Sequence, residues 1–146
     1  MANYLIHRSG ISSAGAYQVS GVPYVSGSAA TIPGTNNASW QVSFPHVTKW
    51  ITIENKGSNA LRIGFSDFGV RGLTAGAPSE NYFILPAAGD NDLSRITLDL
   101  RVKDVFLATD HATNTTTAQI VAGLTFVSTE ELTGTADNWS GSSGVG

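Results

Sequence analysis

The chain has 146 residues, the size of one ordinary domain, and contains no cysteine, which excludes disulfides, thiolate metal sites and cysteine nucleophiles. Only 13% of its residues are charged, well below the usual share, so the surface must be largely neutral. The net charge of -3 argues against the basic footprint of a nucleic-acid binder, and no stretch approaches the ~20 apolar residues of a spanning helix, so we expect neither nucleic acid nor a membrane as a partner.

The first third of the chain is unusual because no Asp, Glu, Lys or Arg occurs between Ser9 and Thr48. Gly, Pro and Ser break this segment, which disfavours helix. Its β-compatible pieces are residues 16–19, 22–25 and 40–44. We consider two interpretations: the irregular first part of a β-sandwich, or an arm that lies across a neighbouring subunit, where burying a charge would be costly.

The next segment, WITIENKGSNALRIGFS (residues 50–66), predicts a β-hairpin around a turn at residues 55–59. Apolar residues alternate with polar ones on both sides of this turn, as in strands with one buried face. The candidate core residues are Ile51, Ile53, Leu61, Ile63 and Phe65. We expect Gly57 to have a positive φ in the turn, and Gly64 to leave space for a neighbouring side chain or backbone.

Three further strand segments follow. NYFILPA (residues 81–87) reads as a short apolar strand that Pro86 ends. SRITLDLRVKDVFLATD (residues 94–110) alternates clearly, but its apolar phase switches at Asp104 and Val105, which predicts a β-bulge or a crossing between sheets. The third segment is TTTAQIVAGLTFVS (residues 115–128). In the second segment, Ile96, Leu98, Leu100 and Val102 are expected to face inward, and in the third, Ile120, Ala122, Leu124 and Phe126.

These pieces add up to about eight short strands, with no helix of ten or more residues. We therefore predict an all-β fold, an antiparallel β-sandwich of jelly-roll-like type. An immunoglobulin-type sandwich is the runner-up, although the expected tryptophan and tyrosine-corner spacing is missing. The predicted divisions are an N-terminal arm at residues 1–15, the sandwich at 16–132 and a flexible C-terminal tail at 133–146.

No pattern in the sequence predicts a catalytic, metal or cofactor site. His7, His46 and His111 lack the spacing of metal ligands, and no serine lies in a G-x-S-x-G elbow. Asp67 and Arg71 indicate a structural ion pair within an ordered loop. The remaining acidic residues that we considered, and interpret as polar loop residues, are Asp90, Asp92, Glu130 and Glu131.

Aromatic and apolar residues in the neutral segments are the candidate interface residues. They are Tyr4, Ile6, Tyr17, Tyr24, Trp40 and Trp139. Trp40 and Trp139 lie among Asn and Ser residues and are expected to be exposed, whereas core packing is expected for Trp50. Exposed rings of this kind, together with Tyr82, would also suit a carbohydrate-binding, lectin-like module such as a host-attachment component, which is the alternative function.

The segments KWITIENKGSNALRIGFSDFGVRG, NYFILPA and ITLDLRVKDVFLA, at about residues 47–108, resemble small β-sandwich capsid decoration (cement) proteins of tailed bacteriophages. The resemblance implies a non-enzymatic virion protein on the capsid surface, usually a homotrimer, that clamps and stabilises neighbouring major capsid protein subunits. It implies no catalytic residue. The uncharged segment and residues 1–15 would then supply arms to neighbouring subunits.

Overall fold

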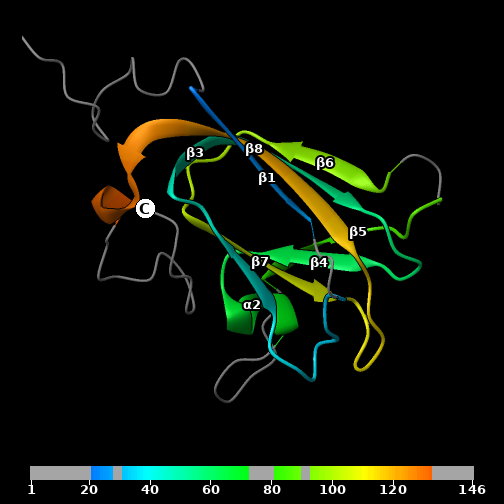
Figure 1. Cartoon of the computed structure of the whole chain (residues 1–146). Helices are drawn as coiled ribbons and strands as arrows, with labels where there is room; N and C mark the ends of the chain where they lie inside the picture. The colour runs from blue at the N-terminus through cyan, green and yellow to red at the C-terminus, as the bar shows by residue number, and fades with distance from the viewer. Residues whose placement is uncertain (1–20, 28–30, 73–80, 90–92, 133–146) are drawn as a thin grey trace, which may run out of the picture.

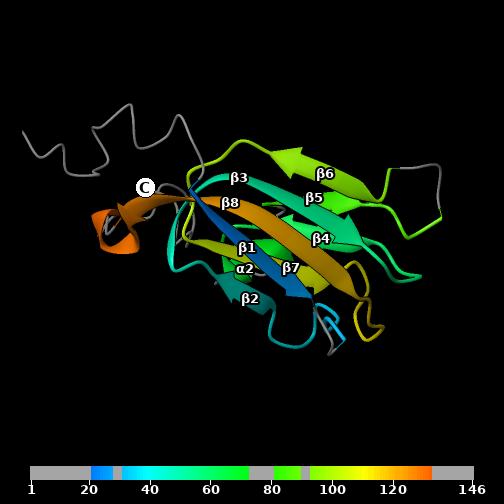
Figure 2. The ribbon, with the colours of Figure 1, turned by 45° about the horizontal axis from the view of Figure 1, so that its top comes forward.

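The computed structural model describes residues 21–27, 31–72, 81–89 and 93–132, and they form two stacked antiparallel sheets of four strands each (Figure 1). The first sheet contains, in spatial order, β1 (Val22–Gly27), β8 (Ala118–Ser128), β3 (His46–Asn55) and β6 (Arg95–Leu98). The second sheet contains β2 (Trp40–Ser43), β7 (Asp104–Thr109), β4 (Leu61–Gly64) and β5 (Tyr82–Leu85). Figure 2 shows the first sheet with β6 at one edge and β1 at the other.

The strand order is that of a jelly roll. At each connection between successive strands the chain passes from one sheet to the other, except between β4 and β5, which are neighbours in the second sheet. The predicted all-β sandwich is therefore confirmed, with eight strands in the described residues. The helices of the described ranges are short, α2 (Asp67–Arg71) and the 3-10 helix η1 (Thr129–Leu132), and none there is long and apolar enough to cross a membrane.

The core lies between the two sheets and is built from the alternate residues that the sequence singled out. Ile51 and Ile53 of the first sheet, and Leu61 and Ile63 of the second, are buried as predicted. Phe65 is only partly buried and packs at the margin of this core. Burying such side chains between two sheets supplies the main driving force for folding, at about 25 cal/mol per Å² of apolar surface.

The predicted hairpin at residues 50–66 is wrong. The chain reverses direction after Asn55, but β3 pairs with β6 and β8, while β4 pairs with β5 and β7 in the other sheet. Two strands that bury alternate residues in one core show the same local pattern whether they lie side by side or on opposite sheets. The alternation therefore predicted the buried residues of β3 and β4 correctly, but it did not predict which strands pair with them.

The corner between β3 and β4 depends on Asn55, which is fully buried. Its amide nitrogen donates to the carbonyls of Asn59 at 2.8 Å and Pro86 at 2.9 Å, and its amide oxygen accepts from the backbone N–H of Gly57 at 3.1 Å. The predicted positive φ of Gly57 is wrong. Gly57 is instead needed for close packing, because a Cβ there would lie 2.8 Å from the backbone nitrogen of Thr117.

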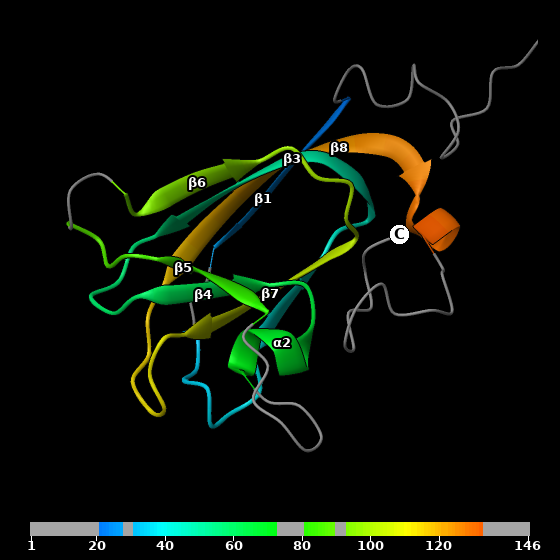
Figure 3. The same ribbon diagram turned by 180° about the vertical axis from the view of Figure 1, so that it is seen from behind.

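The phase switch near Asp104 is a crossing between sheets, one of the two predicted explanations. β6 ends at Leu98 in the first sheet, and β7 begins at Asp104 in the second. All six residues of β7 are buried, and α2 packs against the outer face of β7 and β4, where Val70 contacts Phe106 and Ala108 (Figure 3). Gly64 of β4 leaves the space for that helix, as expected, since a Cβ there would lie 2.9 Å from the Cβ of Val70.

Of three residues near strand ends that are predicted to face inward, one is buried and two are exposed. Val102 is buried as predicted, but Leu100 is 36% exposed and Phe126 is 61% exposed. The inward prediction for Phe126 is wrong because the pairing of β3 with β8 shifts register between His46 and Trp50. The shift reverses the alternation of β8, so that Val127 is buried in place of Phe126.

Two of the strand pieces predicted early in the chain are present in the structure. The pieces at residues 22–25 and 40–44 correspond to β1 and β2. The predicted piece at residues 16–19, the arm at residues 1–15 and the tail at residues 133–146 lie outside the described residues.

Candidate interaction surface

β6 is one edge strand of the first sheet and β5 is one edge strand of the second, and they lie at the same side of the sandwich (Figures 1 and 3). An apolar groove opens at this side. Its volume is about 480 Å³. The residues that line it are Ile63, Phe65, Asn81, Tyr82, Phe83, Ile96, Leu98 and Leu100, none of which carries a charge. We call this feature the open side.

Phe83 shows that the open side is a part of the core left uncovered. In the register of the second sheet, Phe83 is opposite Ile63, so its side chain is on the inner face of the sheet. Ile63 is 2% exposed, whereas Phe83 is 54% exposed. Uncovered apolar side chains that face inward are typical of a surface that contacts another group.

Both strands at the open side have a free edge within the described residues. β6 pairs with β3 alone, and β5 pairs with β4 alone. A strand edge presents backbone N–H and C=O groups that can pair with a further strand. The open side therefore combines uncharged apolar side chains with backbone groups suited to strand addition.

Of the predicted interface residues, the structure describes two, Tyr24 and Trp40. Tyr24 and Trp40 are partly buried and pack against the core, and the ring of Tyr24 meets that of Phe44 edge-on at 5.0 Å. The expectation of an exposed Trp40 is therefore wrong: its ring belongs to the margin of the core. The other four, Tyr4, Ile6, Tyr17 and Trp139, lie outside the described residues.

Two further aromatic residues differ from the roles considered for them. Trp50 alternates with the buried Ile51 along β3, which places it half-buried on the outer face of the first sheet and contradicts the expected core packing. Tyr82 is partly buried, with the guanidinium of Arg62 stacked 4.1 Å from its ring centre. Arg62 also donates to Asp110 at 2.6 Å, so this aromatic ring is engaged within the fold.

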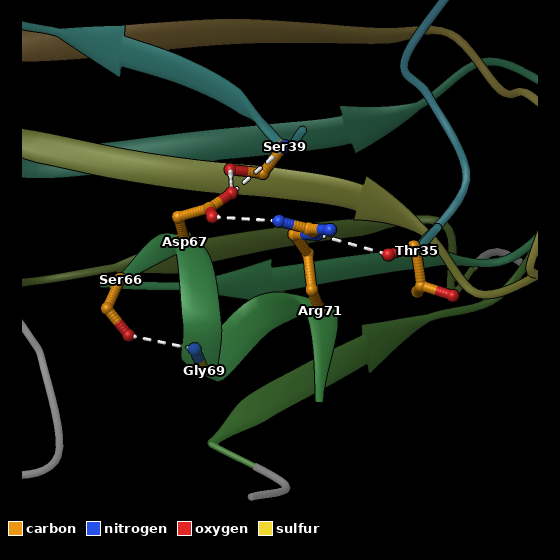
Figure 4. Close-up of polar contacts among 6 residues, drawn as sticks. All are labelled: Thr35, Ser39, Ser66, Asp67, Gly69 and Arg71. Carbon is orange, nitrogen blue, oxygen red and sulfur yellow. Dashed lines mark hydrogen bonds and ion pairs between the residues drawn. The ribbon is translucent and has the colours of Figure 1, made fainter. Parts of the chain in front are cut away.

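Asp67 and Arg71 form the predicted ion pair, at 3.1 Å, but they do so across one turn of helix α2 and not within a loop (Figure 4). Asp67 also accepts hydrogen bonds from the hydroxyl of Ser39 at 2.6 Å and from its backbone N–H at 3.0 Å, and Arg71 donates to the carbonyl of Thr35 at 3.1 Å. The pair thus ties the loop before β2 to α2. Burial raises the pKa of Asp67, but the hydrogen bonds from Ser39 and the Arg71 guanidinium outweigh it and leave the pKa below 3.8.

In the described residues, no group of three or more His, Asp or Glu side chains is placed to hold a metal ion. His46 is half-buried with its Nδ1 unpaired, while the Nδ1 of the exposed His111 accepts the backbone N–H groups of Thr113 and Asn114. Glu130 is exposed, but it lies in the 3-10 helix η1 and not in the loop that the sequence predicted. His7, Asp90, Asp92 and the side chain of Glu131 lie outside the described part.

A second, smaller hollow of about 290 Å³ lies on the outer face of the first sheet. The polar residues in its lining include Thr52, Glu54, Arg95 and Gln119. The described residues that line it include no aromatic ring, which a sugar-binding platform needs for stacking. This hollow therefore gives no support to the carbohydrate-binding alternative.

No family model, no curated protein sequence and no solved structure matches this chain. Its functional interpretation consequently rests on its own residues. The residues of the open side were missed at the level of sequence, although one signal pointed to them. The four consecutive apolar residues 82–85 give β5 apolar side chains on both faces, which is typical of a strand with further surface to cover.

Proposed function

We propose that this chain is a non-enzymatic structural protein of a virion, a capsid decoration protein that binds major capsid protein subunits at the capsid surface and stabilises the shell. The observation that carries the proposal is the open side, where core side chains such as Phe83 lie uncovered beside two free strand edges. A domain with such a surface is suited to an assembly of several protein chains, in which the surface packs against a further copy of the domain or against a subunit of the shell. The assignment to a virion rests on the resemblance of residues 47–108 to cement proteins.

The uses of the charged side chains support a structural role. Arg62 is committed to Asp110 and Tyr82, and Arg71 to Asp67 and Thr35, so these cations hold loops and strands of the domain itself. The neutral surface suits repeated contacts in a shell, because symmetry multiplies a weak contact many times. The homotrimer that the resemblance implies is a separate prediction, and it competes with the two-fold pairing proposed in the next subsection.

The experiment is co-sedimentation with capsid shells. The chain is expressed together with the major capsid protein encoded in the same genome, and assembled shells are pelleted through sucrose. We expect the chain in the pellet at a fixed ratio to the capsid subunit, and shells that dissociate at a higher temperature than undecorated ones. Deletion of residues 2–15 is expected to weaken attachment, while circular dichroism shows an unchanged β-sandwich.

Two results would overturn the proposal. One is a folded chain that stays in the supernatant at every ratio tested. The other is specific binding to immobilised glycans without binding to shells, which would favour the carbohydrate-binding module. A deletion variant that attaches as strongly as the full chain would overturn the role of residues 2–15 alone.

A further inference from the structure

We propose that the open side is an interface between two copies of this chain, which associate by antiparallel pairing of β6 with β6 of the second copy. The inference does not depend on the capsid assignment, since it follows from the edge strand and the groove. Pairing of this kind would join the two first sheets into one continuous sheet of eight strands.

The sequence of β6 and its next residue, Arg95-Ile96-Thr97-Leu98-Asp99, is complementary to itself when reversed. If the two-fold axis passes beside Thr97, Arg95 of each copy is opposite Asp99 of the other. Ile96 is then opposite Leu98, and Thr97 is opposite Thr97. Residues directly opposite in an antiparallel pair have Cβ atoms about 4.5–5.5 Å apart and point to the same face.

The two faces of this pairing agree with the exposure of the residues. Arg95, Thr97 and Asp99 are exposed on the outer face, where the Thr97 hydroxyl is 2.8 Å from that of Thr52. Ile96 and Leu98 point to the groove. The pairing therefore sets two opposite-charge pairs in solvent and brings Ile96 and Leu98 of the second copy to the side where Phe83 is uncovered.

Charge complementarity favours a second copy over an unrelated segment. A partner strand in this register must bring an acid opposite Arg95, apolar residues over the groove and a base opposite Asp99, and β6 itself meets all three requirements. Exposed ion pairs contribute little affinity, about 0–1 kcal/mol each, so their role here is to set orientation and register, while the apolar side chains supply affinity. β5 carries no charge that could set a register.

The first test is the mass of the purified full chain by light scattering over a dilution series. We expect twice the chain mass of 15.2 kDa at high concentration, with dissociation to monomer on dilution. A mass that stays at one chain overturns the proposal. A closed trimer does so too, because a two-fold strand pairing ends at two copies.

The second test exchanges the charges. Asp99→Arg places Arg opposite Arg95 at both ends of the interface, and Arg95→Asp places two acids there, so each variant alone should raise the dimer Kd at least about tenfold. Mixing the two variants should restore dimers, as should the double variant. Arg95→Asp places an acid beside Glu54, its cross-strand neighbour on β3, and can therefore lower the stability of the fold. A folding defect cannot restore dimers, so the mixing experiment tests the interface even in that case.

A matched pair of phenylalanines tests the groove itself. Phe83 and Phe126 are 54% and 61% exposed, but only Phe83 lines the open side. Phe83→Asp should weaken dimerisation, and Phe126→Asp should leave the dimer Kd unchanged. Equal effects of the two substitutions, or a dimer indifferent to Asp99→Arg, would contradict the proposed interface. Co-sedimentation with shells is a separate measurement, so a failed β6 interface and a failed capsid assignment give different results.

Discussion

The side chain of Asn55, the last residue of β3, donates a hydrogen bond to the carbonyl of Pro86, the first residue after β5, over 2.9 Å. β3 and β5 belong to different sheets, so this contact joins the two layers at one end of the sandwich. Thr116 also donates to the amide oxygen of Asn55, at 2.9 Å, which adds the segment before β8 to the same corner.

Asn55→Ala should lower the free energy of unfolding by about 1–3 kcal/mol, because it leaves the carbonyl of Pro86 and the backbone N–H of Gly57 without the hydrogen bonds that Asn55 makes with them. Urea denaturation measures this change. Asn114→Ala is the matched control: Asn114 is exposed, and its substitution should change stability by less than about 0.5 kcal/mol. A loss at Asn55 no larger than that of the control would show that the corner does not depend on this side chain.

Gly57→Ala should destabilise the fold by about 1–3 kcal/mol, since the new methyl group would lie 2.8 Å from the backbone nitrogen of Thr117 and closer still to the Thr116 hydroxyl. Thermal unfolding at fixed pH gives the comparison. Gly27→Ala provides the control, because a Cβ there meets only the Gln119 side chain, at 3.9 Å. Equal melting temperatures for the two variants would contradict the close packing at Gly57.

The Asp67–Arg71 pair should stabilise the protein in a pH-dependent way. The pKa of Asp67 is lowered in the folded state, so its contribution is fully present above the unfolded-state pKa, about 3.9, and is lost as pH falls through the folded-state pKa. Asp67→Asn should therefore destabilise the protein near neutral pH, and the difference from the wild type should shrink below about pH 4. Denaturation curves measured at several pH values test this, and a difference that grows on acidification would contradict the sign.

The strands could be predicted from the sequence because alternation records which residues are buried, and Ile51, Ile53, Leu61 and Ile63 are all in the core. Their partners could not be predicted, since β3 and β4 show the same alternation in opposite sheets as they would in a hairpin. The phase switch near Asp104 was informative because a change of sheet exchanges the buried face.

The candidate interface was harder to find because exposure depends on what lies beside a strand. Trp40 has polar neighbours in sequence but packs against the core. Phe83 has the pattern of a core residue, and it is exposed only because β5 and β6 are edge strands at the same side of the sandwich. The exposure of both side chains depends on the order of the strands in the sheets, and a local sequence pattern does not give that order.

The most direct test of the open side as an interface uses the absence of cysteine from the chain. A single substitution, Thr97→Cys, places two thiols across the proposed two-fold axis, within the reach of a disulfide. Mild oxidation at a concentration where the wild type is dimeric should give a covalent dimer on non-reducing gels, while Thr52→Cys, on the same face one strand inward, should not. A Thr97→Cys variant that stays monomeric, or crosslinks no faster than Thr52→Cys, would contradict the pairing of β6 strands.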